Sequence, residues 1–398
     1  MANTKAARIE AMTGDEVAAE AMRQINPDVV AAYPITPQTE IVQTFSQFVA
    51  DGRVHTEMIR VESEHSAMSA CVGAASAGAR SMTATSANGL ALMWEVLYIA
   101  ASTRLPITMP LANRALSGPI NIHCDHSDSM GARDAGWIQL YSENCQEIYD
   151  NMVQAVRIAE HKDVLLPVMV CFDGFIISHA TERVDLLEDE VVQKFIGVPQ
   201  PKNPLLDTAN PVTYGPLDLF DYYFEHKRQQ VEGMENAGPV IKEIAADFEK
   251  LSGRSYGFLE TYNVEDSDVV IIAIGSTAGT ARVALEELKE KGINVGLVKV
   301  RTFRPFPDLE LRALLKDKAA VGVMDRSASF GAAGGPLFLE VRSALYEESK
   351  RPMIVDLIYG LGGREITVKN IHGIAERLID IKKSGKPGAL VEYVGVRE

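Results

Sequence analysis

The feature that most constrains the fold of this chain is a repeated alternation of short apolar runs with helix-forming stretches. In the first half, apolar runs cover residues 29–32 and 106–112, a further strand is expected over 81–85, and the stretches between them favour helices over 39–49, 63–77 and 90–101. Alternation of this kind predicts an α/β fold, in which a largely parallel sheet carries helices on both faces. Ligands bind such sheets beyond the carboxyl ends of the strands. The loops that follow the strands are therefore where we look for a site.

The rest of the chain indicates a connecting segment and a second unit. Residues 182–265 carry a long charged helix around 218–250, preceded by a proline-rich stretch with Pro199, Pro201, Pro204, Pro211 and Pro216. We interpret this segment as one that wraps or bridges subunits and has no core of its own. Further apolar runs then predict buried strands over 268–274, 295–300, 319–325 and 353–358. The expected division is thus 1–181, 182–265 and 266–398.

Charge and cysteine content narrow the class of protein. The formal net charge of -15 argues against binding to nucleic acid or an anionic membrane surface. No apolar run approaches the roughly 18 residues of a membrane span, and we expect a soluble cytoplasmic protein. The four cysteines form no C-x-x-C pair, which disfavours a metal or iron–sulfur site built by this chain alone. A three-ligand site around Cys124, in the loop 123–126, is the less favoured alternative.

Three segments carry the polar groups with the clearest chemistry. In Tyr33-Pro34-Ile35-Thr36-Pro37 the two prolines restrict the backbone. Thr36 therefore has little conformational entropy left to lose when it binds a ligand. Arg114 follows the apolar run 106–112, and its guanidinium matches a carboxylate through two parallel hydrogen bonds. A rigid turn that caps the next helix is the alternative for the first segment, and a surface salt bridge is the alternative for Arg114.

Glu64 is the most informative single residue. It opens a helix of small residues, where a carboxylate also stabilises the helix dipole without any further role. Thiamine catalysis, however, requires a buried carboxylate hydrogen-bonded to the pyrimidine ring nitrogen. Together Glu64, Thr36 and Arg114 form a set suited to a thiamine pyrimidine ring and an anionic 2-oxoacid.

Other loops leave alternatives open. The polar loop 121–134 fits a site wall and a subunit contact equally well. Gly275–Gly279 follows a strand but lacks the dinucleotide fingerprint, so a tight turn is the better interpretation. Gly360–Arg364 is suited to a partner or to a cofactor phosphate. The chain has no Gly-Asp-Gly segment followed by an Asn-Asn type metal ligand. If it works on thiamine diphosphate, another polypeptide supplies half of that site.

These segments carry a resemblance that extends from about residue 18 to residue 397. The chain resembles alpha subunits of the multi-subunit pyruvate:ferredoxin oxidoreductases (pyruvate synthases), in the 2-oxoacid:ferredoxin oxidoreductase family. The matching stretches are Ala32-Tyr-Pro-Ile-Thr-Pro37, Val61-Glu-Ser-Glu-His-Ser-Ala-Met-Ser-Ala70, Thr83–Ala87, Gly89–Met93, Asn113–Ile122, Arg133–Gln139, Arg304–Pro307 and Gly360–Arg364.

The resemblance implies a pyrimidine-binding thiamine domain followed by a smaller transketolase C-terminal-like domain. It assigns activation of the pyrimidine ring to Glu64 and binding of the substrate to Thr36 and Arg114. We also expect Tyr33, Pro34, Thr85 and Asn88 to contact thiamine diphosphate, and we assign no metal ligand to this chain.

The resemblance also implies the partners and the reaction. A beta subunit holds the diphosphate and Mg²⁺, gamma and delta subunits complete the complex, and delta carries [4Fe-4S] clusters. The expected reaction is reversible, CoA-dependent oxidation of pyruvate to acetyl-CoA and CO₂, with electrons passed to ferredoxin.

Alternatives to pyruvate oxidation stay open at this point. The run Asn113–Pro119 differs from the pattern of 2-oxoglutarate enzymes and favours pyruvate or a branched 2-oxoacid. The loop 123–128 departs from the Trp-Asn-Asp-His-Gln-Asp of many relatives, which bears on the shape of the pocket. The same chemistry on 2-oxoisovalerate or an aryl 2-oxoacid is one rival. A non-catalytic scaffold subunit and a transketolase-type half enzyme are the others.

Overall fold

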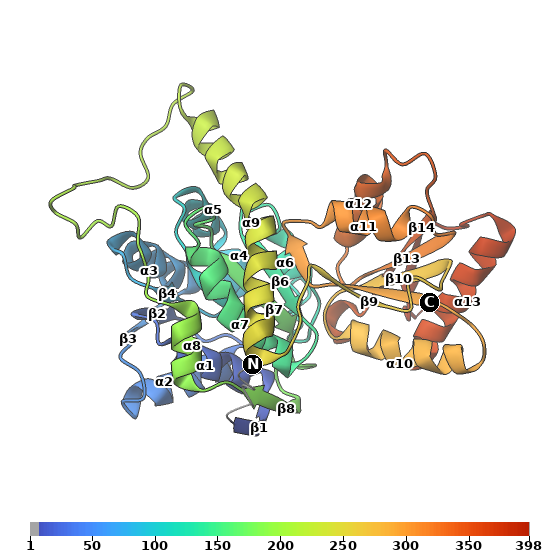
Figure 1. Cartoon of the computed structure of the whole chain (residues 1–398), viewed down its shortest axis with the longest axis horizontal. Helices are drawn as coiled ribbons and strands as arrows, with labels where there is room; N and C mark the ends of the chain where they lie inside the picture. The colour runs from blue at the N-terminus through green and yellow to red at the C-terminus, as the bar shows by residue number, and fades with distance from the viewer. Residues whose placement is uncertain (1–7, 398) are drawn as a thin grey trace.

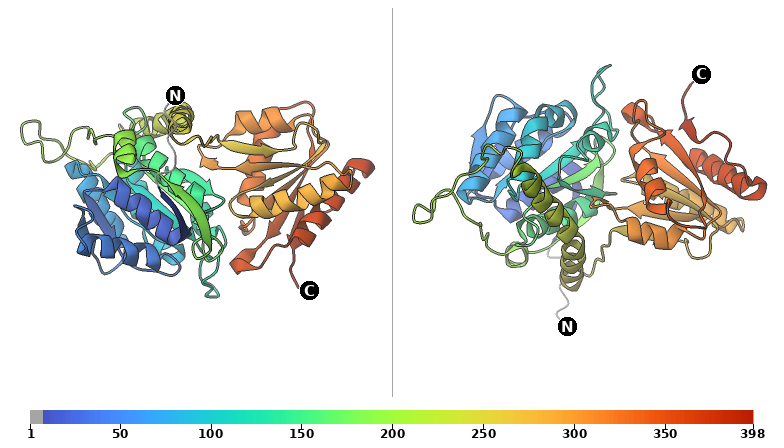
Figure 2. Two further views of the ribbon diagram at one scale, coloured as in Figure 1. Left: turned by 60° about the horizontal axis from the view of Figure 1, so that its bottom comes forward. Right: turned by 90° about the horizontal axis from the view of Figure 1, so that it is seen from above.

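The computed structural model describes residues 8–397, which form two α/β lobes (Figures 1 and 2). The first lobe is built on a seven-stranded sheet of order β12-β6-β7-β5-β4-β2-β3. Its strands are β2 (Val29–Ala32), β3 (Glu57–Arg60), β4 (Ser81–Met82), β5 (Thr108–Asn113), β6 (Ile138–Ser142), β7 (Val168–Asp173) and β12 (Thr302–Arg304). All neighbours pair in parallel except β12, which runs antiparallel to β6. The predicted α/β class with a parallel sheet is confirmed.

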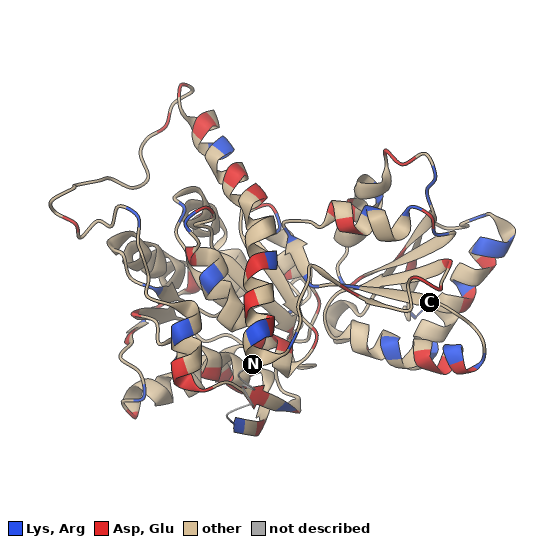
Figure 3. Ribbon diagram, viewed as in Figure 1, with Lys and Arg blue, Asp and Glu red and all other residues tan. Residues whose placement is uncertain are grey.

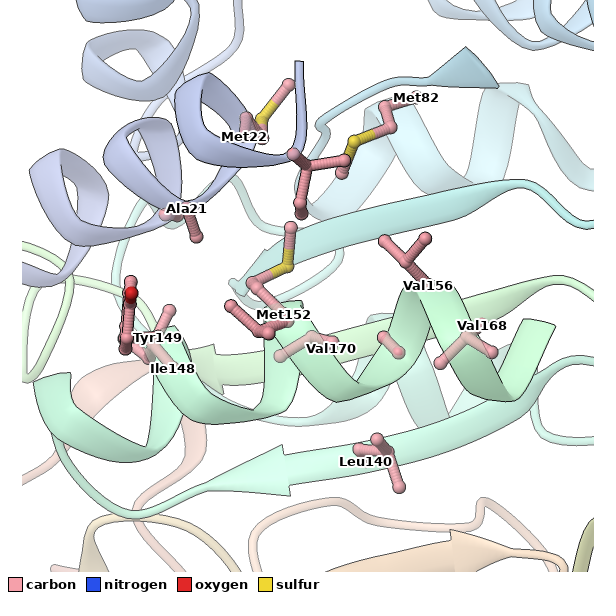
Figure 4. Packing of buried hydrophobic residues seen from close by; sticks show 14 of the residues in the cluster. Ala21, Met22, Met82, Leu140, Ile148, Tyr149, Met152, Val156, Val168 and Val170 are labelled. Carbon is pink, nitrogen blue, oxygen red and sulfur yellow. The ribbon is translucent and has the colours of Figure 1, made fainter. Parts of the chain in front are cut away.

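Helices cover both faces of this sheet. One face carries α1 (Gly14–Ile25), α2 (Thr39–Ala50) and α7 (Cys145–Glu160), and the other carries α3 (Glu64–Ala77), α4 (Ala87–Leu92) and α5 (Trp94–Ser102). Figure 4 shows Met152 of α7 beside the strand residue Val170, with Met22 of α1 in the same cluster of buried side chains. A short helix, α6 (Ser127–Gly131), lies in the polar loop.

The second lobe has a six-stranded sheet of order β15-β14-β13-β10-β11-β9. Its strands are β9 (Leu259–Tyr262), β10 (Val269–Ala273), β11 (Gly296–Val300), β13 (Ala320–Asp325), β14 (Met353–Tyr359) and β15 (Val391–Val394). Its helices are α10 (Thr277–Glu290), α11 (Asp308–Leu315), α12 (Pro336–Leu345), the 3₁₀ turn η1 (Leu361–Gly363) and α13 (Val368–Ser384). Only β9, which comes from the expected connecting segment, is antiparallel to its neighbour.

The connecting segment contributes a helix and an arm. A two-stranded ribbon, β1 (Arg8–Thr13) with β8 (Thr181–Leu186), precedes α8 (Asp189–Ile196). The long helix α9 (Tyr223–Ser252) buries Val240, Ile241, Ile244 and Phe248 in the core of the first lobe. Its first turns and the preceding residues 197–222, here called the arm, stand away from the body (Figure 1). Residues 197–222 carry few charges, whereas the first turns of α9 carry charges of both signs (Figure 3).

Some expected elements differ from the structure. The strand 81–85 shortens to Ser81–Met82, and Thr85 makes a single bridge to Leu111. The helix 90–101 is divided into α4 and α5 at Met93. The long helix starts at Tyr223, five residues later than the expected start near residue 218, and contains Pro239 in its interior. The pairing of β12 with the first sheet was not foreseen, because three residues leave too short a pattern.

Asp173, at the end of β7, links the two lobes through hydrogen bonds. Its carboxylate is fully buried and accepts hydrogen bonds from His126 Nε2 (2.7 Å) and Arg326 Nη1 (3.0 Å). It also accepts from the backbone N–H (3.1 Å) and the hydroxyl of Ser276, in the turn before α10. Burial alone would raise the pKa of Asp173, but the charges of Arg326 and His126 hold this pKa well below its ordinary value. Cys124, weighed above as a metal ligand, lies in the same cluster, where Arg326 already balances the carboxylate charge.

We predict that Asp173→Asn destabilises the protein, because it leaves the Arg326 charge buried without a counterion. A loss of about 3–5 kcal/mol lowers the midpoint of thermal unfolding of a chain of this length by about 4–6 °C. Because the folded-state pKa lies below the ordinary 3.8, this contribution is present above about pH 4 and is lost as the pH falls further. Calorimetry on the complex, with the exposed Asp163→Asn as control, checks this. An unchanged midpoint in Asp173→Asn would contradict the assignment.

Candidate active site

The predicted site residues follow adjacent strands of the first sheet. In the sheet order β5-β4-β2-β3 all neighbours are parallel, so the carboxyl ends of these strands lie at one edge. Arg114 follows β5, Thr85 follows β4, the loop 33–37 follows β2, and Glu64 follows β3. The edge of the sheet therefore gathers side chains that are far apart in the sequence.

Glu64 is the first residue of α3 and is buried, with 6% of its surface exposed. Ser63 caps the helix by accepting a hydrogen bond from the Ser66 N–H at 3.3 Å, which fixes where the helix begins. The Glu64 carboxylate forms no ion pair with any residue between 8 and 397. It is thus available to a ligand in the same buried environment.

Gly89 in α4 is a site residue that the sequence analysis quoted only within a matching stretch. A Cβ atom at this position would lie 2.7 Å from Glu64 Oε1 and 2.4 Å from Thr85 Oγ1. Any side chain would therefore displace the carboxylate or the hydroxyl. Thr85 Oγ1 is itself buried without a hydrogen-bond partner among the described residues. A free buried hydroxyl beside a buried carboxylate fits a polar ring such as the thiamine pyrimidine.

Arg114 and Thr36 are in direct contact. Arg114 Nη1 donates to the Thr36 carbonyl oxygen at 2.9 Å, and Nε donates to the Asn121 carbonyl oxygen at 2.9 Å. Burial lowers the pKa of Arg114, and Asp128 opposes that shift. Nη2 donates to no group among the described residues, while the Thr36 side chain is exposed. The Arg114 guanidinium and the Thr36 hydroxyl can therefore both donate hydrogen bonds to a bound anion.

Asp128 connects these loops by accepting hydrogen bonds from both of them. This role was not predicted from the sequence for a residue of the polar loop. One carboxylate oxygen accepts from the backbone N–H groups of Arg114 and Ala87, both at 3.0 Å. The other accepts from Asn113 Nδ2 (2.8 Å) and from the Ser129 N–H (2.7 Å). Burial raises the pKa of Asp128 to about 6, against the lowering effect of these hydrogen bonds.

The remaining predicted cofactor residues lie at the rim. Tyr33 and Pro34 are exposed, and the side-chain oxygen of Asn88 accepts from the Ser117 N–H (3.1 Å) and hydroxyl (3.0 Å). Asn88 thus fastens the exposed loop 115–120. Gln38, absent from the predictions, holds the loop 33–37 by donating to the Ala84 carbonyl oxygen at 2.8 Å.

The second lobe supports the wall of the site. Asn121 Nδ2 donates to the Gly362 carbonyl oxygen at 3.0 Å, and the Gly362 N–H donates to Asp125 at 3.1 Å. Gly360–Arg364, whose role was open, therefore packs against the polar loop that also holds Arg114. Gly275–Gly279 forms the tight turn that was favoured and binds Asp173 through Ser276.

The arrangement brings a buried carboxylate, hydroxyl groups and an arginine to one edge of a parallel sheet, in the part of the chain that matches a thiamine diphosphate-binding family. Residues 20–246 match the family described as pyruvate flavodoxin/ferredoxin oxidoreductase, thiamine diphosphate-binding, and residues 267–371 match the pyruvate:ferredoxin oxidoreductase core domain II. The chain belongs to the 2-oxoacid:ferredoxin oxidoreductase family, as an alpha-type subunit.

Relatives with the names of pyruvate synthase subunits match nearly end to end. The chain is 59% identical to "Pyruvate synthase subunit PorA" of Thermotoga maritima over 98% of both chains. It is 47% identical to the subunit of the same name from Methanocaldococcus jannaschii, again over 98% of both. It is 42% identical to "Ketoisovalerate oxidoreductase subunit VorA" of Pyrococcus horikoshii over 96% of both.

Solved structures confirm the fold. A 2-oxoglutarate:ferredoxin oxidoreductase from Magnetococcus marinus aligns with a TM-score of 0.72 at 22% identity, over 94% of this chain and 65% of that one. A split-gene transketolase, described as an inactive beta4 tetramer, aligns with a TM-score of 0.54 at 14% identity, over 94% and 100%. Within residues 8–397, none of the helices is both long and apolar enough to cross a membrane.

We predict that turnover by the assembled complex rises with pH through about 6, where Asp128 ionises and accepts all of its hydrogen bonds. Asp128→Asn places an amide N–H₂ opposite two donors, so kcat/KM falls about tenfold to a hundredfold and this pH step disappears. The effect on stability has the opposite sign. The folded protein binds the extra proton between about pH 4 and 6, so this carboxyl's contribution to stability declines as pH rises through that window.

The measurement is a pH profile of kcat/KM, with Asp134→Asn, an exposed carboxylate of the same loop, as the control. An Asp128→Asn profile that keeps the step near pH 6 would show that another group titrates there.

Proposed function

We propose that this chain is the alpha-type subunit of a pyruvate:ferredoxin oxidoreductase. The complex oxidises pyruvate with CoA to acetyl-CoA and CO₂, reversibly, and passes the electrons to ferredoxin. The observation that carries the proposal is the convergence of Glu64, Thr85, Thr36 and Arg114 at the ends of adjacent parallel strands. The near full-length similarity to subunits named pyruvate synthase supports pyruvate as the substrate.

Each residue of the half-site has a distinct role in this proposal. Bound thiamine diphosphate supplies the nucleophilic carbon and the electron sink. Glu64 exchanges a proton with the pyrimidine nitrogen, and Thr85 offers that ring a second polar contact. Arg114 and the Thr36 hydroxyl hold the substrate carboxylate next to the reacting carbon. Tyr33 and Pro34 form the exposed rim, and Glu64 lies buried.

The partners follow from what this chain leaves to others. We assign the diphosphate and Mg²⁺ contacts to a beta subunit, and the [4Fe-4S] clusters that feed ferredoxin to a delta subunit, with a gamma subunit completing the complex. The arm supports an assembled state, since Leu217, Phe220 and Phe224 are 89%, 91% and 79% exposed. A cytoplasmic location and the division into 1–181, 182–265 and 266–398 belong to the same proposal.

Oxidation of 2-oxoisovalerate is the second candidate, favoured by the 42% identity to a ketoisovalerate oxidoreductase subunit. The two candidates share every role assigned to this chain. They differ in the apolar volume offered to the acyl group, so a comparison of substrates separates them.

Glu64→Gln is the direct test of the half-site. The amide cannot exchange the proton, so we expect kcat to fall by about 10²–10⁴-fold while the complex stays assembled. The matched control is Glu62→Gln, because Glu62 lies two residues away on the same turn and is exposed. We expect this control to stay within about twofold of wild type. Activity of Glu64→Gln above about a tenth of wild type would refute the catalytic role.

A second test addresses the arm. Replacing Phe220 and Phe224 by serine removes the two most exposed aromatic side chains of the arm, so we expect the chain to dissociate from the complex at lower dilution in size-exclusion chromatography. Phe330→Ser is the control, since Phe330 is 98% exposed on the second lobe. Equal dissociation of the arm variant and wild type would remove the arm from the interface.

A further inference from the structure

Three chain segments meet beside the site and bring together two carboxylates and an imidazole. Asp15 is the second residue of α1, Glu40 is the second residue of α2, and His179 lies in the loop after β7. One ligand atom from each lies within 4.8 Å of the others. His179 Nδ1 is 3.8 Å from Asp15 Oδ2, and His179 Nε2 is 3.9 Å from Glu40 Oε1.

Asp15 has no partner that accounts for its burial. Its side chain is fully buried, and neither carboxylate oxygen has a hydrogen-bond partner among the described residues. The α1 N-terminus therefore does not satisfy it through N–H donors. Burial raises the pKa of Asp15 well above its ordinary value, and the nearby charges of Glu40 and Glu16 add to the shift. Buried carboxylates are stable when paired or bound to a metal ion.

His179 is oriented as a ligand would be. Its Nδ1 lies 2.7 Å from Ser178 Oγ, which also accepts the Phe175 N–H at 2.8 Å. The ring packs on Phe175 with centroids 4.7 Å apart. A hydrogen bond at Nδ1 leaves the Nε2 lone pair facing Glu40, which is the arrangement of metal-bound histidines.

We propose that Asp15, Glu40 and His179 bind a divalent transition-metal ion. Imidazole with carboxylates suits Mn²⁺, Fe²⁺ or Zn²⁺. Ligand atoms at about 2.1 Å from such an ion lie about 3–4.2 Å apart. The separation of 3.9 Å between His179 Nε2 and Glu40 Oε1 falls in this range, and one ligand atom of each of the three residues lies within 4.8 Å of the others. The His179 and Glu40 side chains are 31% and 47% exposed, which gives the ion a route of entry.

The ion would join the segments that position the substrate loop. Glu40 lies four residues beyond Thr36, on the helix that continues the loop 33–37. His179 belongs to the loop that starts at Gly174, where a Cβ atom would come within 2.7 Å of Pro37 and 2.4 Å of the Asn113 carbonyl oxygen. The site uses none of the residues assigned to thiamine or substrate, so it extends the proposed function without depending on it.

The test is Mn²⁺ binding by the assembled complex after dialysis against a chelator, read from free Mn²⁺ by electron paramagnetic resonance. We expect wild type to bind about one equivalent per chain more than His179→Asn. The control His161→Asn, a partly exposed histidine beside Asp163, should bind as wild type does. Crystals of the complex in Mn²⁺ should give an anomalous peak among the three side chains.

Equal Mn²⁺ binding by wild type and His179→Asn, with no anomalous peak, would overturn the proposal. If His179→Asn does not assemble, Glu40→Gln provides the same comparison from a half-exposed position. Neither readout uses turnover, so failure here is distinguishable from failure of the proposed function.

Discussion

The candidate site depends on one buried carboxylate, that of Asp128, to which no contact with substrate is assigned. Asp128 accepts backbone N–H groups from the loops that follow β4 and β5, and the side-chain amide of Asn113. These hydrogen bonds fix the backbone at Arg114 and at the start of α4. The position of α4 in turn sets how closely Gly89 approaches Glu64. A carboxylate with burial of this degree is stable in its charged form only with several donors, so the loops and the carboxylate hold each other in place.

The second lobe extends this support. Asp173 binds the turn before α10 and Arg326 after β13, while Gly362 binds the polar loop from the other side. β12 adds a strand from the later part of the chain to the first sheet, and one hydrophobic cluster runs through both lobes. A lobe without proposed catalytic residues thus fixes the loop that carries Arg114 and Asn121.

Much of the half-site is predictable from local pattern, because strand ends in a parallel sheet place successive loops at one edge. Glu64, Thr36 and Arg114 follow predicted strands or open a predicted helix, and the contact of Arg114 with Thr36 agrees with their shared assignment. Gly89 was missed as a site residue, since its role depends on an approach between two helices. Asp15, Glu40 and His179 lie on three separate elements, so no spacing in the sequence brings them together. Asn88, the second residue of α4, accepts a hydrogen bond from Ser117, and its expected contact with the cofactor stays a prediction.

The central claim is that this chain forms the pyrimidine half of a pyruvate-oxidising complex. The most direct measurement is CoA-dependent reduction of a viologen dye by the complex purified anaerobically with this chain. It compares pyruvate, 2-oxoisovalerate, phenylglyoxylate and 2-oxoglutarate as substrates. The account predicts a strong preference for pyruvate. A preference for another acid would contradict the substrate assignment, and no reduction with any acid in a cluster-replete preparation would contradict the enzymatic role itself.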